Sequence, residues 1–312
     1  MMGNMIKKIP IPLCGVMLGT AALGNLLQSY SEGIRYICGG IAGFLFMLVL
    51  LKLLLYPEVV REDLKNPILA SVAGAFSMSL MLLSVYVKPW LGAAAYGIWL
   101  LAIGLHILLI LYFTVKFIVK LHMPKVFASY YIVYVGIVTA SVTAPSYERE
   151  DVGNVIFWFG FISLILLLVL ITIRYIKYRE IGESEKPLIC IYAAPFNLCI
   201  VGYLQSVEQK NYEFLMGMFI VASILYVFAL VKAVSYLRLP FYPSYASFTF
   251  PFVISATAAK QIMNAFADRG DVIPYLQYVV LIETIIATIF VVYTLIRFLW
   301  FLSVRTWNCQ KM

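Results

Sequence analysis

Three phenylalanines surround a proline in the stretch SFTFPF, residues 247–252. An aromatic ring can close a narrow path between helices, because an apolar constriction excludes water and ions. Aromatic side chains in apolar stretches more often face lipid or pack in a core. Pro251 lies eight residues after Pro243, and Pro195 lies eight residues after Pro187. Because proline within a helix removes a hydrogen bond and bends the chain, these positions indicate two bent helices, either as packing kinks or as elements that shape a path.

Three ionisable side chains interrupt the apolar stretches. Lys260 lies 17 residues beyond Pro243, which is about 25 Å along a helix, so we expect it at an external mouth. There it either attracts anions by its field or extends its ammonium to the membrane interface. Glu283 is either a proton-coupling group or a structural contact on an outer helix. His106 either titrates near neutrality or makes packing hydrogen bonds.

The composition places these residues in an all-α integral membrane protein. The 312 residues are 63% hydrophobic and only 12% charged, far from the balance of a soluble domain. We expect one transmembrane domain, residues 1–312, since a span needs about 20 apolar residues. The ten predicted spans are 9–28, 34–55, 68–87, 91–119, 126–144, 152–177, 187–206, 212–237, 245–267 and 273–303.

The positive charge predicts orientation in the membrane. The net charge is +8, with 23 Lys and Arg residues. All but six fall on the side of the chain termini; the exceptions are Arg35, Lys88, Arg149, Lys210, Lys260 and Arg269. We expect a multi-pass protein of the plasma membrane. By the positive-inside rule, both of its termini are expected in the cytoplasm. The expected partner is membrane lipid, and no nucleic acid is expected.

A proline near the start of every odd-numbered span marks an internal repeat. Pro10, Pro67, Pro124, Pro187 and Pro243 are separated by 56 to 63 residues, a near-constant period typical of repeated structural units. The expected unit is a helical hairpin, repeated five times. The odd spans carry small and polar residues whereas the even spans are apolar throughout, so we expect an inner ring of odd helices around a central pore and an outer ring of even helices.

Polar positions within lipid must face protein or water. The odd spans therefore supply the candidate pore-lining residues. These are Gly15, Gly19, Thr20, Ser71, Ser77, Thr139, Thr143, Asn197, Ser247, Thr249, Ser255 and Thr257.

The opening PLCGVMLGTAALGN, the ten spans and SFTFPF resemble the tellurite-resistance/dicarboxylate transporter family. That family includes bacterial TehA-like proteins and plant slow anion channels, and the resemblance covers about residues 8–303. It implies five helical hairpins, a homotrimer with one pore per subunit, and anion permeation. Matching the TFP context assigns the family's pore-plugging phenylalanine to Phe250, with Phe248 and Phe252 as its neighbours.

The middles of the odd spans contain no basic residue. Hydroxyl and amide groups there can donate hydrogen bonds to an anion without holding it tightly, which suits conduction. This favours a passive channel for small monovalent anions, because a dicarboxylate carrier is expected to face its substrate with arginine. The alternative is a proton-coupled carrier or exporter of C4-dicarboxylates, sulfite or tellurite-like oxyanions, for which Glu283 and His106 are the candidate coupling groups.

Other classes of protein are less consistent with the sequence. An intramembrane enzyme needs a constellation such as HExxH, GxSxG or paired aspartates, none of which occurs. A receptor predicts larger loops and no repeat of polar helices. The five cysteines form no CxxC pair, so neither a metal site nor a cofactor is expected.

Overall fold

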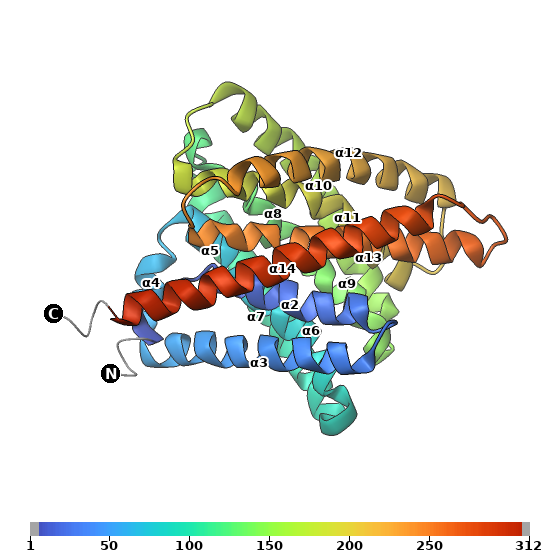
Figure 1. The fold of residues 1–312 in the computed structure, drawn as a ribbon, viewed down its shortest axis with the longest axis horizontal. Helices are drawn as coiled ribbons and strands as arrows, with labels where there is room; N and C mark the ends of the chain where they lie inside the picture. The colour runs from blue at the N-terminus through green and yellow to red at the C-terminus, as the bar shows by residue number, and fades with distance from the viewer. Residues whose placement is uncertain (1–5, 308–312) are drawn as a thin grey trace.

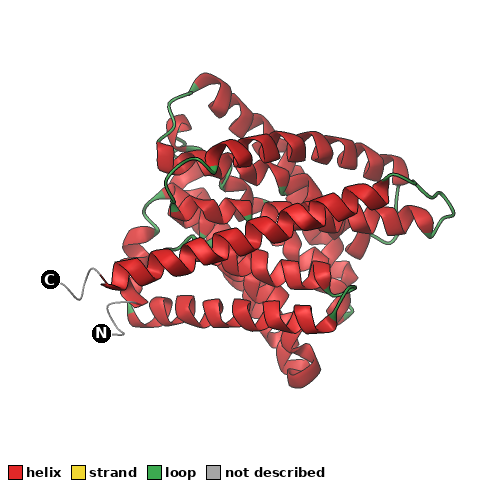
Figure 2. Cartoon of the chain, in the orientation of Figure 1, coloured by secondary structure: helices red, strands yellow, loops and turns green. Residues whose placement is uncertain are grey.

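The computed structural model describes residues 6–307, and in that part of the chain every regular element is helical and no strand occurs (Figures 1 and 2). Residues 1–5 and 308–312, the chain ends for which a cytoplasmic location was predicted, lie outside the described residues. The α-helices are α2 (Leu13–Leu27), α3 (Glu32–Leu55), α4 (Pro57–Asp63), α5 (Pro67–Val72), α6 (Gly74–Leu91), α7 (Ala93–Phe113), α8 (Tyr130–Tyr134), α9 (Thr139–Thr143), α10 (Glu150–Lys177), α11 (Pro195–Ser206), α12 (Tyr212–Tyr236), α13 (Phe250–Ala267) and α14 (Leu276–Trp307).

Shorter helical turns connect or precede these helices. One is a π-helix, η1 (Thr114–Ile118), which continues α7. The others are 3₁₀-helices: η2 (Met123–Lys125), η3 (Gly136–Val138), η4 (Ala144–Tyr147), η5 (Glu183–Ala193) and η6 (Pro243–Phe248).

Seven helical stretches among the described residues are long and apolar enough to cross a membrane. They are Glu32–Leu55, Pro67–Leu91, Ala93–Ile118, Glu150–Lys177, Glu183–Ser206, Tyr212–Tyr236 and Leu276–Ser303. They correspond to all five even-numbered predicted spans and to two odd-numbered ones. The prediction of an all-helical protein with several membrane-length helices is therefore confirmed.

The three remaining predicted spans are shorter or interrupted helices. The first contains α2, which has 15 residues. The fifth is divided among α8, η3, α9 and η4, and the ninth is divided between η6 and α13. Small and polar residues lower the hydropathy of these stretches, and 3₁₀ turns interrupt their length. The count of ten spans stays a prediction.

Burial separates the two kinds of span. In the even-numbered spans only 28 to 39% of the most apolar window is buried inside the protein, whereas the value is 67% for Pro67–Leu91 and 89% for Glu183–Ser206. The even spans therefore leave apolar side chains on the outside, as a lipid-facing helix does. The odd spans supply much of the core.

Contacts between odd spans form a closed sequence. Helix α2 packs against α6, α6 against α9, α9 against α11, α11 against α13, and α13 returns to α2. Each odd span also contacts the even span that follows it, as in the pairs α2–α3, α6–α7 and α13–α14. Figure 1 shows α2, α13 and α14 side by side although they come from opposite ends of the chain.

Local sequence explains where the third span begins. Pro67 is the first residue of α5, where its missing N–H has no helical acceptor to lose. The preceding residue, Asn66, caps this helix, because its Oδ1 accepts hydrogen bonds from the backbone N–H groups of Ile68 (2.8 Å) and Leu69 (3.3 Å). Proline and its cap thus fix the start of the third span.

Candidate functional site

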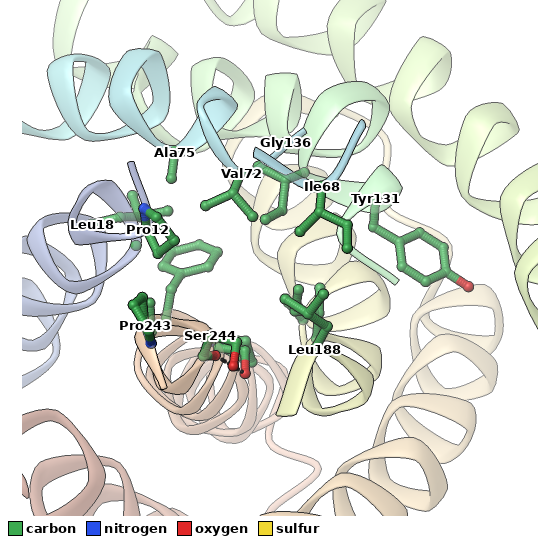
Figure 3. A pocket seen from close by; sticks show the side chains of 18 of the residues that line it. Pro12, Leu18, Ile68, Val72, Ala75, Tyr131, Gly136, Leu188, Pro243 and Ser244 are labelled. Carbon is green, nitrogen blue, oxygen red and sulfur yellow. Dashed lines mark hydrogen bonds between the residues drawn. The ribbon is translucent and has the colours of Figure 1, made fainter. Parts of the chain in front are cut away.

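A cavity of about 300 Å³ lies where the five odd spans meet. Each span contributes to its wall, and Figure 3 shows side chains from all five around one opening. One residue from each span is Leu18, Val72, Gly136, Leu188 and Phe250. These residues are far apart in the sequence, so the cavity is a product of the whole arrangement of helices.

The cavity changes from polar at its mouth to apolar inside. Asn66, Ser184, Glu185, Tyr242 and Ser244 line the end at which the odd spans begin, and Asn66 and Ser184 are exposed there. Deeper in, the wall is built largely of aliphatic side chains, glycine and proline. Of the described wall residues, Glu185 is the single one that carries a charge. The deep part therefore offers an ion no fixed countercharge.

Hydrogen bonds hold the polar mouth together. The Tyr242 hydroxyl donates to Glu183 Oε1 over 2.8 Å, and this bond to a carboxylate raises the pKa of Tyr242. Ser244 Oγ donates to the Ser184 carbonyl over 2.5 Å. The start of η5 is thereby tied to the start of η6, which fixes Glu185 beside the opening.

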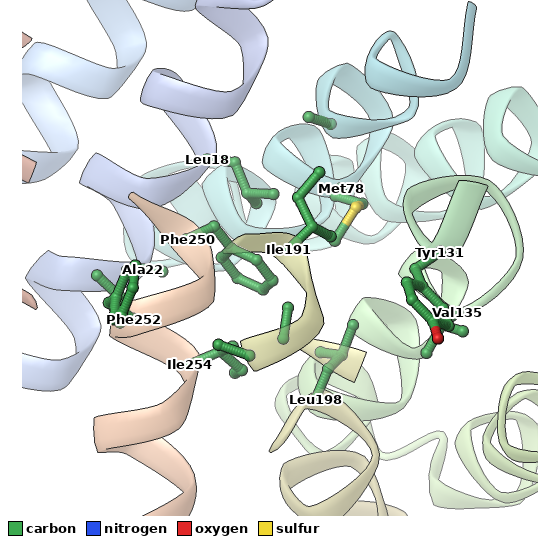
Figure 4. Packing of buried hydrophobic residues seen from close by; sticks show 14 of the residues in the cluster. Leu18, Ala22, Met78, Tyr131, Val135, Ile191, Leu198, Phe250, Phe252 and Ile254 are labelled. Atoms are coloured by element: carbon green, nitrogen blue, oxygen red, sulfur yellow. The ribbon is translucent and has the colours of Figure 1, made fainter. Parts of the chain in front are cut away.

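Phe250 lines the cavity and is 7% exposed. It is the first residue of α13, and only Thr249 separates it from the 3₁₀-helix η6. Figure 4 shows its ring turned towards Ile191 and Met78, with Leu18 nearby on the adjoining helix. A phenyl ring surrounded by aliphatic side chains makes an apolar constriction, which excludes water and ions.

The two neighbouring phenylalanines do not line the cavity. Phe248 is fully buried and packs on Tyr245 and Phe290, with ring centroids 4.7 and 5.7 Å apart. Phe252 is also fully buried and packs on Tyr226 and Phe290, at 5.6 and 4.7 Å. Both rings thus pack on α14, and Phe252 also packs on α12, which leaves Phe250 as the member of the trio on the cavity wall.

Pro195 and Pro251 both lie on the cavity wall at the start of an α-helix. Each follows a 3₁₀ segment, η5 before α11 and η6 before α13. The sequence indicated a bend within a continuous helix, and the structure instead has a change of helix type at each proline. The backbone of Thr249, at φ −95° and ψ −90°, marks this change before α13.

Two of the twelve candidate lining residues, Gly15 and Ser247, belong to the cavity wall. The other ten lie elsewhere in the odd spans, and their role in lining a pore beyond this cavity stays a prediction. They are Gly19, Thr20, Ser71, Ser77, Thr139, Thr143, Asn197, Thr249, Ser255 and Thr257. All of these except Thr257 are buried.

Several of these side chains join neighbouring odd spans by hydrogen bonds. Asn197 Nδ2 donates to Ser255 Oγ over 2.8 Å, and Thr249 Oγ1 donates to the Gly15 carbonyl over 2.8 Å. Ser71 Oγ and Ser129 Oγ are 2.8 Å apart. Polar side chains in a low-dielectric interior are stable when they find such partners, so these residues hold the helices around the cavity.

Other polar candidates bond within a helix or to an even span. Thr20 and Thr257 donate to the carbonyls of Val16 and Val253, four residues before each. Thr143 accepts from Trp99 Nε1 over 2.8 Å. The Thr139 hydroxyl has no partner among the described residues.

Lys260 lies in the second half of α13, away from the cavity mouth, and bridges to the end of α2. Its Nζ donates to the Leu26 carbonyl over 3.2 Å and to Ser29 Oγ. The ammonium also lies 5.3 Å from the centre of the Tyr30 ring. Lys260 therefore anchors the two helices to each other at their ends.

His106 and Glu283 are both buried outside the cavity wall. His106 Nε2 lies 2.9 Å from the Val133 carbonyl, and its Nδ1 lies 2.7 Å from Ser77 Oγ. Both ring nitrogens are thus engaged in bonds between helices. Glu283 is 7% exposed, and its Oε2 has no hydrogen-bond partner within residues 6–307.

The apolar wall residues were not identified from the sequence. Leu18, Met78, Ile191 and Leu198 line the cavity around Phe250. Leucine and isoleucine look alike in a sequence whether they face a core, lipid or a cavity. The proline repeat is the feature of the sequence that could have identified these wall residues, because all of them fall within the odd spans.

The fold and this cavity define a class: an all-helical membrane protein with an apolar, helix-lined recess and no catalytic constellation along it. Residues 8–299 match the family model described as SLAC1, voltage-dependent anion channel. The chain therefore belongs to the SLAC1 family of anion channels, which confirms the resemblance to TehA-like proteins. It is a multi-pass membrane protein of a non-enzymatic channel family, with anions as the expected substrates. A search of curated proteins found no match.

Proposed function

We propose that the chain is a channel for small monovalent anions and that Phe250 closes its path. The observation that carries this proposal is the cavity built by all five odd spans, with Phe250 on its wall. The ring is held among aliphatic neighbours, and Phe248 and Phe252 pack elsewhere. Family membership supplies the class of solute.

The proposed architecture has ten spans in five hairpins, with the odd spans inside and the even spans outside. The closed sequence of contacts α2–α6–α9–α11–α13 supports the inner ring. The low burial of the even spans supports the outer ring. Short helices that are covered by protein on every side can line a path through a membrane without exposing backbone to lipid.

The distribution of charge and the family support a location, an orientation and an oligomeric state for the chain. The basic loops support cytoplasmic termini in a plasma membrane. A homotrimer with one path per subunit rests on family membership. In this orientation the cavity mouth opens to the cytoplasm, because it lies where the odd spans begin.

Weak selectivity among small anions follows from the cavity wall. No lysine or arginine lies on its described part, and Glu185 disfavours anions at the mouth. A wall without fixed positive charge holds no anion tightly, which allows flow. Discrimination then depends mainly on how easily each anion sheds its water, so nitrate is expected to pass more readily than chloride.

The alternative is a proton-coupled carrier or exporter of C4-dicarboxylates, sulfite or tellurite-like oxyanions. The observation in its favour is the buried carboxylate of Glu283 with an unpartnered oxygen, since ionisable groups within membranes often have functional roles. Glu283 is not on the cavity wall. The geometry therefore favours the channel.

The test is anion efflux from proteoliposomes. Vesicles loaded with chloride or nitrate are compared for the native chain and for Phe250→Ala, Phe248→Ala and Phe252→Ala. The proposal expects fast efflux in Phe250→Ala alone, because the other two rings are removed from packing sites away from the cavity. If all three variants are as tight as the native chain and a pH gradient drives malate or sulfite uptake, the carrier takes its place.

A further inference from the structure

A second cavity, of about 520 Å³, opens on the surface between α4 and the neighbouring ends of α3 and α7. Three cations line it: Arg61, Lys65 and Lys116. Each of these side chains is exposed. The apolar part of the wall beside them is formed by Leu53, Pro57, Val60 and Leu64. The cavity thus combines positive charge with apolar surface, outside the path proposed for anions.

A π-helical turn places Lys116 over this cavity. In η1 the Val119 N–H donates to the Thr114 carbonyl over 3.0 Å, five residues back. Such turns are rare and often occur at functional sites. Lys116 Nζ then donates to the Tyr112 hydroxyl over 2.8 Å, and that hydroxyl donates to the Leu64 carbonyl over 2.9 Å. These bonds connect α7 to the end of α4.

Nearby carboxylates only partly neutralise the cavity. Lys65 pairs with Glu62 over 2.6 Å. Asp63 is engaged by the buried Lys52, 2.8 Å away. Arg61 has neither a hydrogen bond nor an ion pair with any described residue, so its guanidinium is free for a ligand. Guanidinium groups match the paired oxygens of phosphate well.

The surface next to the cavity is apolar and suits acyl chains. Leu54 and Leu55 of α3 are exposed, as are Leu111 of α7 and Val115 of η1. Even spans of this kind leave most of their apolar window outside the protein. A ligand that fits both features needs an anionic phosphate at the level of the cations and hydrocarbon alongside the helices.

We propose that this cavity binds the phosphate headgroup of an acidic phospholipid. Basic pockets between membrane helices at the interface have the chemistry that recognises such lipids. Lys65 directly precedes Asn66, which caps α5 and lines the mouth of the central cavity. A bound lipid therefore contacts the connection that positions one wall of that mouth. The binding proposal is independent of which solute passes through the protein.

Native mass spectrometry of the purified protein in neutral detergent provides the test. The protein is titrated with phosphatidylglycerol and, separately, with phosphatidylcholine. The test variant is Arg61→Gln/Lys65→Gln/Lys116→Gln. The matched control is Lys125→Gln/Lys177→Gln/Arg179→Gln, which removes the same charge from exposed residues that do not line the cavity. Arg61→Gln alone provides a milder variant, and size-exclusion profiles verify folding.

The native chain and the control are expected to bind phosphatidylglycerol at least about tenfold more tightly than phosphatidylcholine, since each cation near a membrane surface contributes about fivefold. The triple test variant is expected to lose this preference, and Arg61→Gln to lose about fivefold. An equal loss in the control, or no preference in the native chain, overturns the proposal. Displacement of the lipid by inorganic phosphate at constant ionic strength also overturns it, because the cavity then recognises free phosphate.

Discussion

Replacing Gly19 by alanine tests a close approach between the first and ninth spans. A Cβ at Gly19 would lie 2.4 Å from Thr249 Cβ and 2.8 Å from the Phe250 nitrogen. Carbon atoms in contact prefer about 3.5–4.0 Å, so the two backbones have to separate by about 1 Å. Overpacking of this kind typically costs about 1–3 kcal/mol. The same shift moves the start of α13, where Phe250 is located.

Gly43→Ala is the matched control. Gly43 also lies within an apolar helix, α3, and a Cβ there meets nothing within 4 Å. Alanine at such a position stabilises a helix by about 0.5–1 kcal/mol. The two substitutions add the same methyl group with opposite expected signs, so their difference isolates the packing of α2 on α13.

Thermal unfolding in detergent, followed by intrinsic fluorescence, measures this difference. Gly19→Ala is expected to unfold about 2–6 °C below Gly43→Ala, because the shift in unfolding temperature per kcal/mol falls as chain length rises. Anion efflux from proteoliposomes is expected to change in Gly19→Ala alone, because only that methyl group displaces Phe250. Equal unfolding temperatures for the two variants would refute the close approach of the first and ninth spans.

Three further predictions concern the packing between odd spans, the ion pair between α3 and α4, and the cavity mouth. Asn197→Leu removes a hydrogen bond to α13 and is expected to lower the free energy of unfolding by about 1 kcal/mol. The unfolding temperature is expected to fall, and an unchanged temperature contradicts the role of that bond. Lys52→Met leaves the partly exposed Asp63 without its 2.8 Å partner and is expected to cost about 1.5–3 kcal/mol, as for other hydrogen bonds to charged groups. Lys52→Met/Asp63→Asn is expected to recover part of this loss, and no recovery argues against the pair. In a Phe250→Ala background, Glu185→Gln is expected to raise anion current more at about 0.01 M salt than at about 1 M, because salt screens the mouth charge; an equal effect at both salt concentrations excludes an electrostatic role.

The sequence was sufficient to identify an all-helical protein with several helices long enough to cross a membrane. Low charge and long apolar stretches identify membrane helices, and the repeated prolines distinguish the buried odd spans from the exposed even ones. It was not sufficient for helix continuity. Whether Pro195 bends an α-helix or begins one depends on the 3₁₀ segment before it, and tertiary packing decides between those conformations.

The residues of the candidate site remain a prediction, and the structure shows where each of them lies. Among the three phenylalanines of SFTFPF, the sequence placed Phe250 at the gate only through family resemblance, and the structure puts that ring on the cavity wall. The polar lining was a weaker prediction. Asn197 and Thr249 hydrogen-bond between helices, because a buried polar group gains more from a fixed partner than from an apolar cavity.

Current through planar bilayers tests the central claim most directly. Purified native protein and Phe250→Ala are reconstituted under a nitrate or chloride gradient, with Phe252→Ala as the control of equal volume change. The account predicts large currents in Phe250→Ala that reverse near the equilibrium potential of the anion, with small currents in the other two. Silent bilayers with Phe250→Ala, or currents that reverse at the cation potential, would contradict an anion path closed by Phe250.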